Sequence, residues 1–186
     1  MCANCLGIYR NSTYYLDARE EKKRYKAHDN DVNDRRYQNF VSPIVNYVLE
    51  NFKPEHRGLD FGSGTAPVIS KMLHDKTYSI DQYDPFFSNK IELLNEKYDY
   101  IVCCEVVEHF HYPDVEFERL QRMLKRGGAL VCMTHLYTEE IAFKDWYYKG
   151  DPTHVFFYRP GTIHFIAENY GFSGVEINNR LFVLKS

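Results

Sequence analysis

Two glycines and an acid at a fixed spacing are the first residues in this sequence that could do chemistry. The segment DFGSGTAP contains Gly62 and Gly64, and Asp84 follows Gly64 by twenty positions, at the end of the next apolar run. Glycines permit a tight turn and let a ligand approach the main chain. An acid at the end of the following strand can accept hydrogen bonds from both hydroxyls of a ribose. Either feature alone also occurs in purely structural turns, but together they predict a site for a cofactor that contains a nucleoside.

The residues around the glycines favour S-adenosylmethionine over a nicotinamide dinucleotide. Ala66 stands where the dinucleotide fingerprint has its third glycine, and Pro67 follows it. A pyrophosphate binds to free backbone amides at a helix N-terminus, and the carboxylate of Asp60, directly before the turn, would repel it. The same carboxylate would suit the ammonium group of a methionine moiety.

Two further segments carry residues that could move protons. EVVEHFHYP (105–113) contains Glu108 and His109, and WYYKGDPTHVFFY (146–158) contains Asp151 and His154. Transfer of a methyl group to an oxygen or nitrogen that carries a proton needs a base. We therefore predict His109 and His154 as candidate catalytic bases, with Asp151 orienting His154. The alternative interpretation is a helix start with a packing histidine in the first segment and an ordinary aromatic-rich turn in the second.

Alternating strand and helix patterns must position these residues. Strands are predicted at 57–61, 78–84, 98–106 and 129–136, helices at 37–52, 66–73, 114–125 and 160–172, and a closing hairpin at 175–184. We expect Pro43 to kink or restart the first helix. The alternation predicts an α/β fold with a doubly wound, mostly parallel sheet, helices on both faces and an antiparallel C-terminal hairpin. Ligands bind beyond the C-terminal strand ends of such a sheet, where the glycines and Asp84 lie.

Four segments resemble successive motifs of the class I S-adenosylmethionine-dependent methyltransferases: LDFGSGTAP, YDPFF, YDYIVCCEVVEHF and RGGALVCMTHL, within residues 37–186. The resemblance implies a Rossmann-like methyltransferase fold, a seven-stranded sheet with an antiparallel last strand, and S-adenosylmethionine as cofactor. Matching positions imply that the methionine portion lies against Asp60, Gly62, Ser63 and Gly64, the ribose at Asp84, the adenosine beside Pro85 and Phe86, and the whole cofactor above Cys104 and Glu105.

One region departs from the family pattern. Only 13 residues separate Asp84 from Tyr98, where the family has a helix, a third strand and an acid that binds adenine. The segment FFSNKIELLNEK can hold at most a short edge strand, so we expect a shortened third strand and helix region. Phe86 or Phe87 would then stack on the adenine in place of the acid.

The N-terminal segment resembles the second half of a zinc ribbon followed by a helical lid, as in a bacterial subfamily of these methyltransferases. A four-ligand zinc site needs two cysteine pairs, and Cys2 and Cys5 form the one pair outside predicted strands. We therefore expect no metal, a ribbon remnant and lid over 1–36, and an S-adenosylmethionine-binding methyltransferase domain over 37–186. Tyr25 and His28 are candidate lid residues.

Composition limits the partners of this chain. Its 186 residues carry a net charge of −3, which gives no general attraction to a phosphate backbone and disfavours a nucleic-acid acceptor. No apolar run approaches the roughly 20 residues that span a membrane, and no signal-peptide core is evident, so we expect no membrane partner and a cytoplasmic location. The sequence predicts an enzyme that methylates a small-molecule acceptor. The alternatives are a nucleic-acid or protein methyltransferase, or a non-catalytic regulator that binds S-adenosylmethionine.

Overall fold

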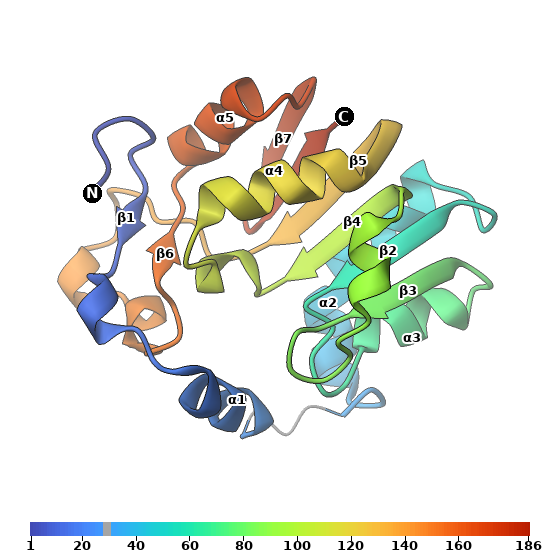
Figure 1. The fold of residues 1–186 in the computed structure, drawn as a ribbon, viewed down its shortest axis with the longest axis horizontal. Coiled ribbons are helices and arrows are strands. Elements are labelled where there is room, and N and C mark those ends of the chain that lie inside the picture. Colours follow the sequence, from blue (N-terminus) through green and yellow to red (C-terminus); the bar gives the residue numbers. More distant parts are fainter. Residues whose placement is uncertain (28–30) are drawn as a thin grey trace.

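The computed structural model describes residues 1–27 and 31–186. Its centre is a six-stranded sheet (Figure 1). Its strand order is β3-β2-β4-β5-β8-β7. The strands are β2 (Arg57–Phe61), β3 (Ser79–Tyr83), β4 (Tyr98–Cys104), β5 (Leu124–Met133), β7 (Gly174–Asn178) and β8 (Leu181–Lys185). The first four pair in parallel, and β8 runs antiparallel to both of its neighbours. The predicted doubly wound sheet with a closing antiparallel hairpin is confirmed.

Helices cover both faces of this sheet. On one face lie α2 (Arg35–Asn51) and α3 (Val68–His74), and on the other lie α4 (Pro113–Met123) and α5 (Pro160–Asn169) (Figure 1). Successive side chains of a strand point to opposite faces, so Tyr100 and Val102 pack beneath α2 and α3 while Ile101 and Cys103 pack beneath α4 and α5. This two-sided burial explains the nearly unbroken apolar run of β4.

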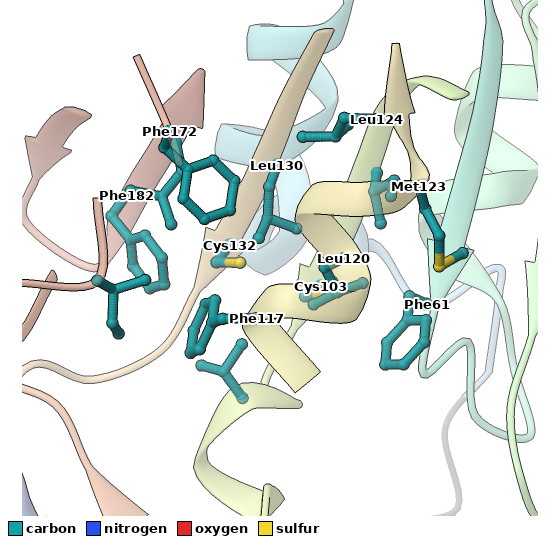
Figure 2. Close-up of a cluster of buried hydrophobic side chains, with 14 of the residues drawn as sticks. Phe61, Cys103, Phe117, Leu120, Met123, Leu124, Leu130, Cys132, Phe172 and Phe182 are labelled. Carbon is teal, nitrogen blue, oxygen red and sulfur yellow. The ribbon is translucent and has the colours of Figure 1, made fainter. Parts of the chain in front are cut away.

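The core on the α4 side is built by aromatic and aliphatic side chains from distant parts of the chain. Figure 2 shows Phe117 and Leu120 of α4 close to Cys103 and Cys132 of the sheet, with Phe182 of β8 beside them. All five side chains are fully buried. This core anchors the segment between β4 and α4, which carries part of the site described below.

Two local details differ from the expected boundaries. α2 continues through Pro43, so the helix does not restart there, and the expected kink stays a prediction. The Oγ of Ser42 donates to the carbonyl of Asn39 at 2.8 Å, the acceptor that the proline nitrogen cannot serve. α4 ends at Met123, earlier than expected, and β5 runs through both glycines that were predicted to end the helix. Gly128 is needed there because an added Cβ would lie 2.8 Å from the carbonyl oxygen of Asp99.

The expected seventh strand is absent from the described chain. Between β3 and β4 the backbone forms a single bridge between Asp84 and Ser88 and then a 3-10 helix, Ile91–Asn95. The short connection leaves no length for a strand beyond β3, so the expectation of a seven-stranded sheet is wrong and the expected shortening of this region is confirmed.

The N-terminal segment joins the long connection between β5 and α5. β1 (Ile8–Tyr9) pairs antiparallel with β6 (Phe156–Phe157), beside the main sheet (Figure 1). α1 (Ala18–Lys26) follows and begins with a capping box formed by Asp17 and Glu20. The division of the chain after residue 36 stays a prediction. Within the described residues, no helix combines the length and apolar character that crossing a bilayer requires.

Candidate active site

A cavity of about 960 Å³ lies beyond the C-terminal ends of β2, β3 and β4. The residues that follow these three strands form its floor, and α1 and the segment 147–154 form much of its cover. All but one of the predicted cofactor-binding residues line it: Gly62, Ser63, Gly64, Asp84, Pro85, Phe86, Cys104 and Glu105. We call the part formed by residues 62–66 and 83–87 the loop half, and the part formed by residues 104–109 and 147–154 the carboxylate half.

The glycine turn of the loop half depends on both of its glycines. Gly62 and Gly64 have φ angles of +81° and +64°, a region that other L-residues rarely adopt. A Cβ on Gly62 would lie 2.5 Å from the side chain of Val106, so Gly62 permits close packing against the carboxylate half. A Cβ on Gly64 would meet nothing within 4 Å, so Gly64 leaves the cavity open at this point.

The side chain of Asp84 organises the loop half by accepting hydrogen bonds from backbone N–H groups. Its Oδ2 accepts a hydrogen bond from the N–H of Gly64 at 2.9 Å, and its Oδ1 accepts from the N–H groups of Phe86 and Phe87 at 2.8 and 3.0 Å. A carboxylate offers about four acceptor positions, so one remains for a ligand hydroxyl. The Oγ of Ser63, in the same wall, is buried and makes no hydrogen bond to any described residue. A polar ligand in the loop half would satisfy it.

Asp60 lies behind the cavity wall rather than in it. Strand alternation turns its side chain toward α3, where it accepts a hydrogen bond from the Oγ of Ser70 at 2.8 Å. Burial raises the pKa of Asp60 to about 6. The predicted contact with the methionine portion is therefore not made by the side chain as the structure places it.

The carboxylate half contains two acids joined by a tyrosine. The Oη of Tyr148 lies 3.0 Å from Oε2 of Glu105 and also contacts Oε1 of Glu108. Burial, and next the neighbouring Glu108, raise the pKa of Glu105 to about 7, and burial raises the pKa of Glu108 to about 7. A phenol has one proton and cannot donate to both carboxylates at once, so the second contact needs a proton on a carboxyl group. Arg180 pairs with Glu105 at 2.8 Å, which places that proton on Glu108.

The two predicted bases lie side by side. The rings of His109 and His154 are 5.0 Å apart in a T-shaped arrangement, and both line the cavity. The Nδ1 of His109 contacts the carbonyl of Thr153 at 2.9 Å, and the Nδ1 of His154 contacts the carbonyl of Tyr148 at 2.7 Å. Burial, followed by the charge of His109, lowers the pKa of His154 to about 4, so this imidazole is neutral at physiological pH.

Asp151 does not orient His154 through its carboxylate, contrary to the expectation. It accepts hydrogen bonds from Arg24 at 2.7 Å and from the hydroxyl of Thr153 at 2.6 Å. Although burial opposes the change, these hydrogen bonds hold the pKa of Asp151 well below its usual range. The carboxylate therefore attaches α1 to the segment 147–154, and the backbone carbonyl of Tyr148 takes the orienting role.

α1 covers the cavity through several contacts. The ring of Tyr25 lies 5.2 Å from that of His109 and 5.7 Å from that of Phe86, so it bridges the two halves. Glu21 pairs with Nε2 of His111 at 3.1 Å. These contacts place Tyr25 where a lid residue was predicted, whereas His28 lies outside the described residues.

Sequence reasoning placed Tyr148 in the candidate cluster 146–158 without giving it a role, and it missed Arg180. Tyr148 belongs to an aromatic run that resembles ordinary packing, and Arg180 stands in the turn between β7 and β8, far along the chain from Glu105. No spacing in the sequence links them. A lone arginine at the tip of a buried hairpin was the one available signal for Arg180. Neither Cys2 nor Cys5 lines the cavity, and the prediction that this pair holds no metal stays a prediction.

Comparison with known proteins gives one family and one fold. A family model described as a methyltransferase domain matches residues 33–177. A SAM-dependent methyltransferase from Archaeoglobus fulgidus superposes with a TM-score of 0.63 at 16% identity, covering 80% of this chain and 94% of that one. No curated protein sequence matches the chain.

Two further solved structures contain a cofactor or its product. Human N-acetylserotonin methyltransferase in complex with SAM gives a TM-score of 0.61 at 13% identity, covering 91% of this chain and 56% of that one. Magnesium protoporphyrin IX methyltransferase from Synechocystis PCC 6803 with bound SAH gives a TM-score of 0.58 at 16% identity, covering 93% of this chain and 95% of that one. At these identities the likeness shows a shared fold.

Proposed function

The chain belongs to the methyltransferase-domain family, and we propose that it transfers a methyl group from S-adenosylmethionine to a small-molecule acceptor. The observation that carries this proposal is the loop half of the cavity. There, two glycines at positive φ, the unpartnered Oγ of Ser63 and the carboxylate of Asp84 lie together at the C-terminal strand ends. This set of groups fits the methionine and ribose portions of the cofactor, and similar folds hold SAM or SAH.

The proposed cofactor position brings its reactive end toward the carboxylate half. Cys104 at the end of β4 and Glu105 after it lie in the wall of the carboxylate half, and the neighbouring Val106 packs against Gly62 of the loop half. S-adenosylmethionine supplies a sulfonium methyl group, and rate enhancement then depends on holding a nucleophile in line with it. The rigid arrangement of Glu105, Glu108 and Tyr148 gives this end of the cavity a fixed shape.

His109 and His154 are suited to receive the acceptor's proton. A carbonyl oxygen can only accept a hydrogen bond, so each Nδ1 carries the proton and each Nε2 is the unprotonated nitrogen. The pKa of about 4 keeps His154 neutral at physiological pH, and it also makes this imidazole a weaker base than an ordinary histidine. Both rings line the cavity, which supports the proposal that they act as bases.

The depth of the carboxylate half supports a small acceptor. His154, which lines the cavity, is only 8% exposed beneath the cover formed by α1 and the segment 147–154. A nucleotide or a protein side chain would have to enter this cover, whereas a small metabolite can be enclosed by it.

Two measurements on the full chain test the proposal. Calorimetry should show S-adenosylhomocysteine binding and NAD not binding. Incubation with S-adenosylmethionine and pooled metabolites should then release S-adenosylhomocysteine with at least one pool. Absence of S-adenosylhomocysteine binding contradicts the proposal. Binding without turnover across broad pools favours the alternative of a non-catalytic regulator.

A further inference from the structure

Three side chains from two segments converge at the base of the carboxylate half. Glu108, His109 and His154 each offer one ligand atom, and these atoms lie within 4.8 Å of one another. Glu108 and His109 belong to the 3-10 helix Val107–His109, and His154 comes from the segment that precedes β6. The backbone N–H of Val155 donates to the carbonyl of Glu108 at 2.9 Å, which fixes one segment against the other.

Both imidazoles are held as metal-binding imidazoles are held in proteins. Each Nδ1 donates to a backbone carbonyl, that of Thr153 for His109 and that of Tyr148 for His154. Metal-ligating histidines commonly donate their second ring N–H to a carbonyl or a carboxylate, which fixes the tautomer and the ring orientation. The Nε2 atoms are then the nitrogens that carry the ligating lone pair.

Glu108 supplies a buried carboxyl group with one oxygen that makes no hydrogen bond to the described residues. Its side chain is 0% exposed, one oxygen contacts Tyr148, and Oε2 has no hydrogen-bond partner among the described residues. Arg180 pairs with Glu105, and no ion pair of Glu108 occurs in the described chain. In the metal-free chain this carboxyl group carries the proton assigned to it above, and it would release that proton on coordinating a metal ion.

We propose that Glu108, His109 and His154 bind a divalent transition-metal ion at the acceptor end of the cavity. Two imidazoles and one carboxylate match the ligand set of catalytic zinc sites, which keep a further position open. Imidazole donors favour zinc and its transition-metal neighbours over magnesium and calcium. The expectation of a metal-free chain depended on counting cysteines, and this site needs none.

The metal site stands on its own geometry, whereas its role in methyl transfer rests on the proposed function. With an ion bound, both Nε2 lone pairs would be used for coordination, so the ion, in place of a histidine base, would favour loss of the acceptor's proton. His109 and His154 line the cavity, so the open position faces the space where the acceptor is proposed to bind. An acceptor that carries a hydroxyl group would coordinate there through its oxygen. The acceptor class inferred from this site is therefore a compound with a hydroxyl group that can coordinate the ion, such as an alcohol, phenol or enol.

The test is a titration of the metal-stripped full chain with Zn²⁺ and with Co²⁺. The chain should carry Cys2→Ser and Cys5→Ser, so that the cysteine pair cannot bind the probe. We expect one equivalent to bind and the Co²⁺ spectrum to show nitrogen and oxygen ligation without a thiolate charge-transfer band. Mg²⁺ in excess should not displace either ion.

Variants locate the site. Glu108→Gln, His109→Ala and His154→Ala should each weaken Zn²⁺ binding by about tenfold or more, whereas His164→Ala, on the exposed face of α5, should leave it unchanged. His109 is only partly buried, so its variant remains informative if the other two fail to fold. No Zn²⁺ or Co²⁺ binding, or binding that all three variants leave intact, overturns the proposal.

S-adenosylhomocysteine calorimetry on the same metal-stripped protein separates this inference from the proposed function. Cofactor binding without metal binding overturns the metal site alone. Metal binding without cofactor binding overturns the proposed function and leaves the metal site standing.

Discussion

The loop half and the carboxylate half of the cavity present different chemical groups to a ligand. The loop half uses backbone: glycines at positive φ, and the N–H groups of Gly64, Phe86 and Phe87 gathered on one carboxylate. The carboxylate half uses buried ionisable side chains, among them Glu108 with a pKa of about 7 and His154 with a pKa of about 4.

This difference teaches how the two tasks are divided. Backbone groups gathered by a turn give a fixed surface that recognises a constant ligand. Perturbed side-chain pKa values cluster where protons or charges are handled. Changes to one half should therefore affect binding of the cofactor, and changes to the other should affect turnover.

The largest expected effect is the loss of turnover when a base is removed. We expect His154→Ala to reduce the rate by about 10²- to 10⁴-fold, the usual range for general base catalysis. Affinity for S-adenosylhomocysteine, measured by calorimetry, should stay within about threefold of the wild type, because His154 lies in the carboxylate half. His164→Ala serves as the matched control. Wild-type turnover in both His154→Ala and His109→Ala would return these histidines to a packing role.

A buried acid behind the loop half should make stability depend on pH. The pKa of Asp60 is about 6 in the folded chain, above its ordinary value, so the folded state binds more protons than the unfolded state between about pH 4 and 6. The cost of its ionised form is fully present above pH 6 and is relieved as pH falls. Asp60→Asn should raise the free energy of unfolding at pH 7 by up to about 3 kcal/mol.

Urea unfolding at several pH values checks this expectation. The difference between Asp60→Asn and the wild type should shrink from pH 7 toward pH 4, while Glu105 and Glu108 titrate alike in both proteins. A difference that stays constant over this range would show that Asp60 keeps an ordinary pKa.

The third effect in size is weaker cofactor binding when the carboxylate of Asp84 is removed from the loop half. Asp84→Ala loses a charge-assisted contact worth roughly 1.5–3 kcal/mol, which is about a tenfold to hundredfold loss of S-adenosylhomocysteine affinity. Since Asp84 also holds three backbone N–H groups, Asp84→Asn is the matched variant that keeps one acceptor oxygen and the side-chain shape. We expect it to lie between the wild type and Asp84→Ala. Unchanged affinity in a folded Asp84→Ala protein would remove the ribose assignment.

The smallest expected effect concerns the cover. Arg24→Ala breaks the ion pair with Asp151. Because the Arg24 side chain is 45% exposed, solvent screens the pair, and we expect it to contribute about 0.2–1 kcal/mol. Affinity for S-adenosylhomocysteine should fall by at most about fivefold, and this difference should disappear at high salt. Arg19→Ala, on the same helix, is a suitable control. A loss that is insensitive to salt would mean that Arg24 contacts the ligand itself.

The same contrast explains how much the sequence could predict. The loop half follows from the chain because Gly62, Gly64 and Asp84 end consecutive strands, so their spacing reflects their proximity. The carboxylate half could be predicted only as separate fragments. Glu105, Tyr148 and Arg180 meet through the order of strands β4, β5 and β8 and through a long connection, and no local pattern encodes their contact. The pairing of Asp151 with Arg24 instead of His154 likewise depends on where α1 lies.

A crystal structure of the complex with S-adenosylhomocysteine tests the division of the cavity most directly. The account predicts a ribose hydroxyl within hydrogen-bond distance of Asp84, a polar ligand atom on the Oγ of Ser63, and the sulfur directed toward His109 and His154. A ligand bound with its ribose away from Asp84, or with its sulfur directed away from the carboxylate half, would contradict it.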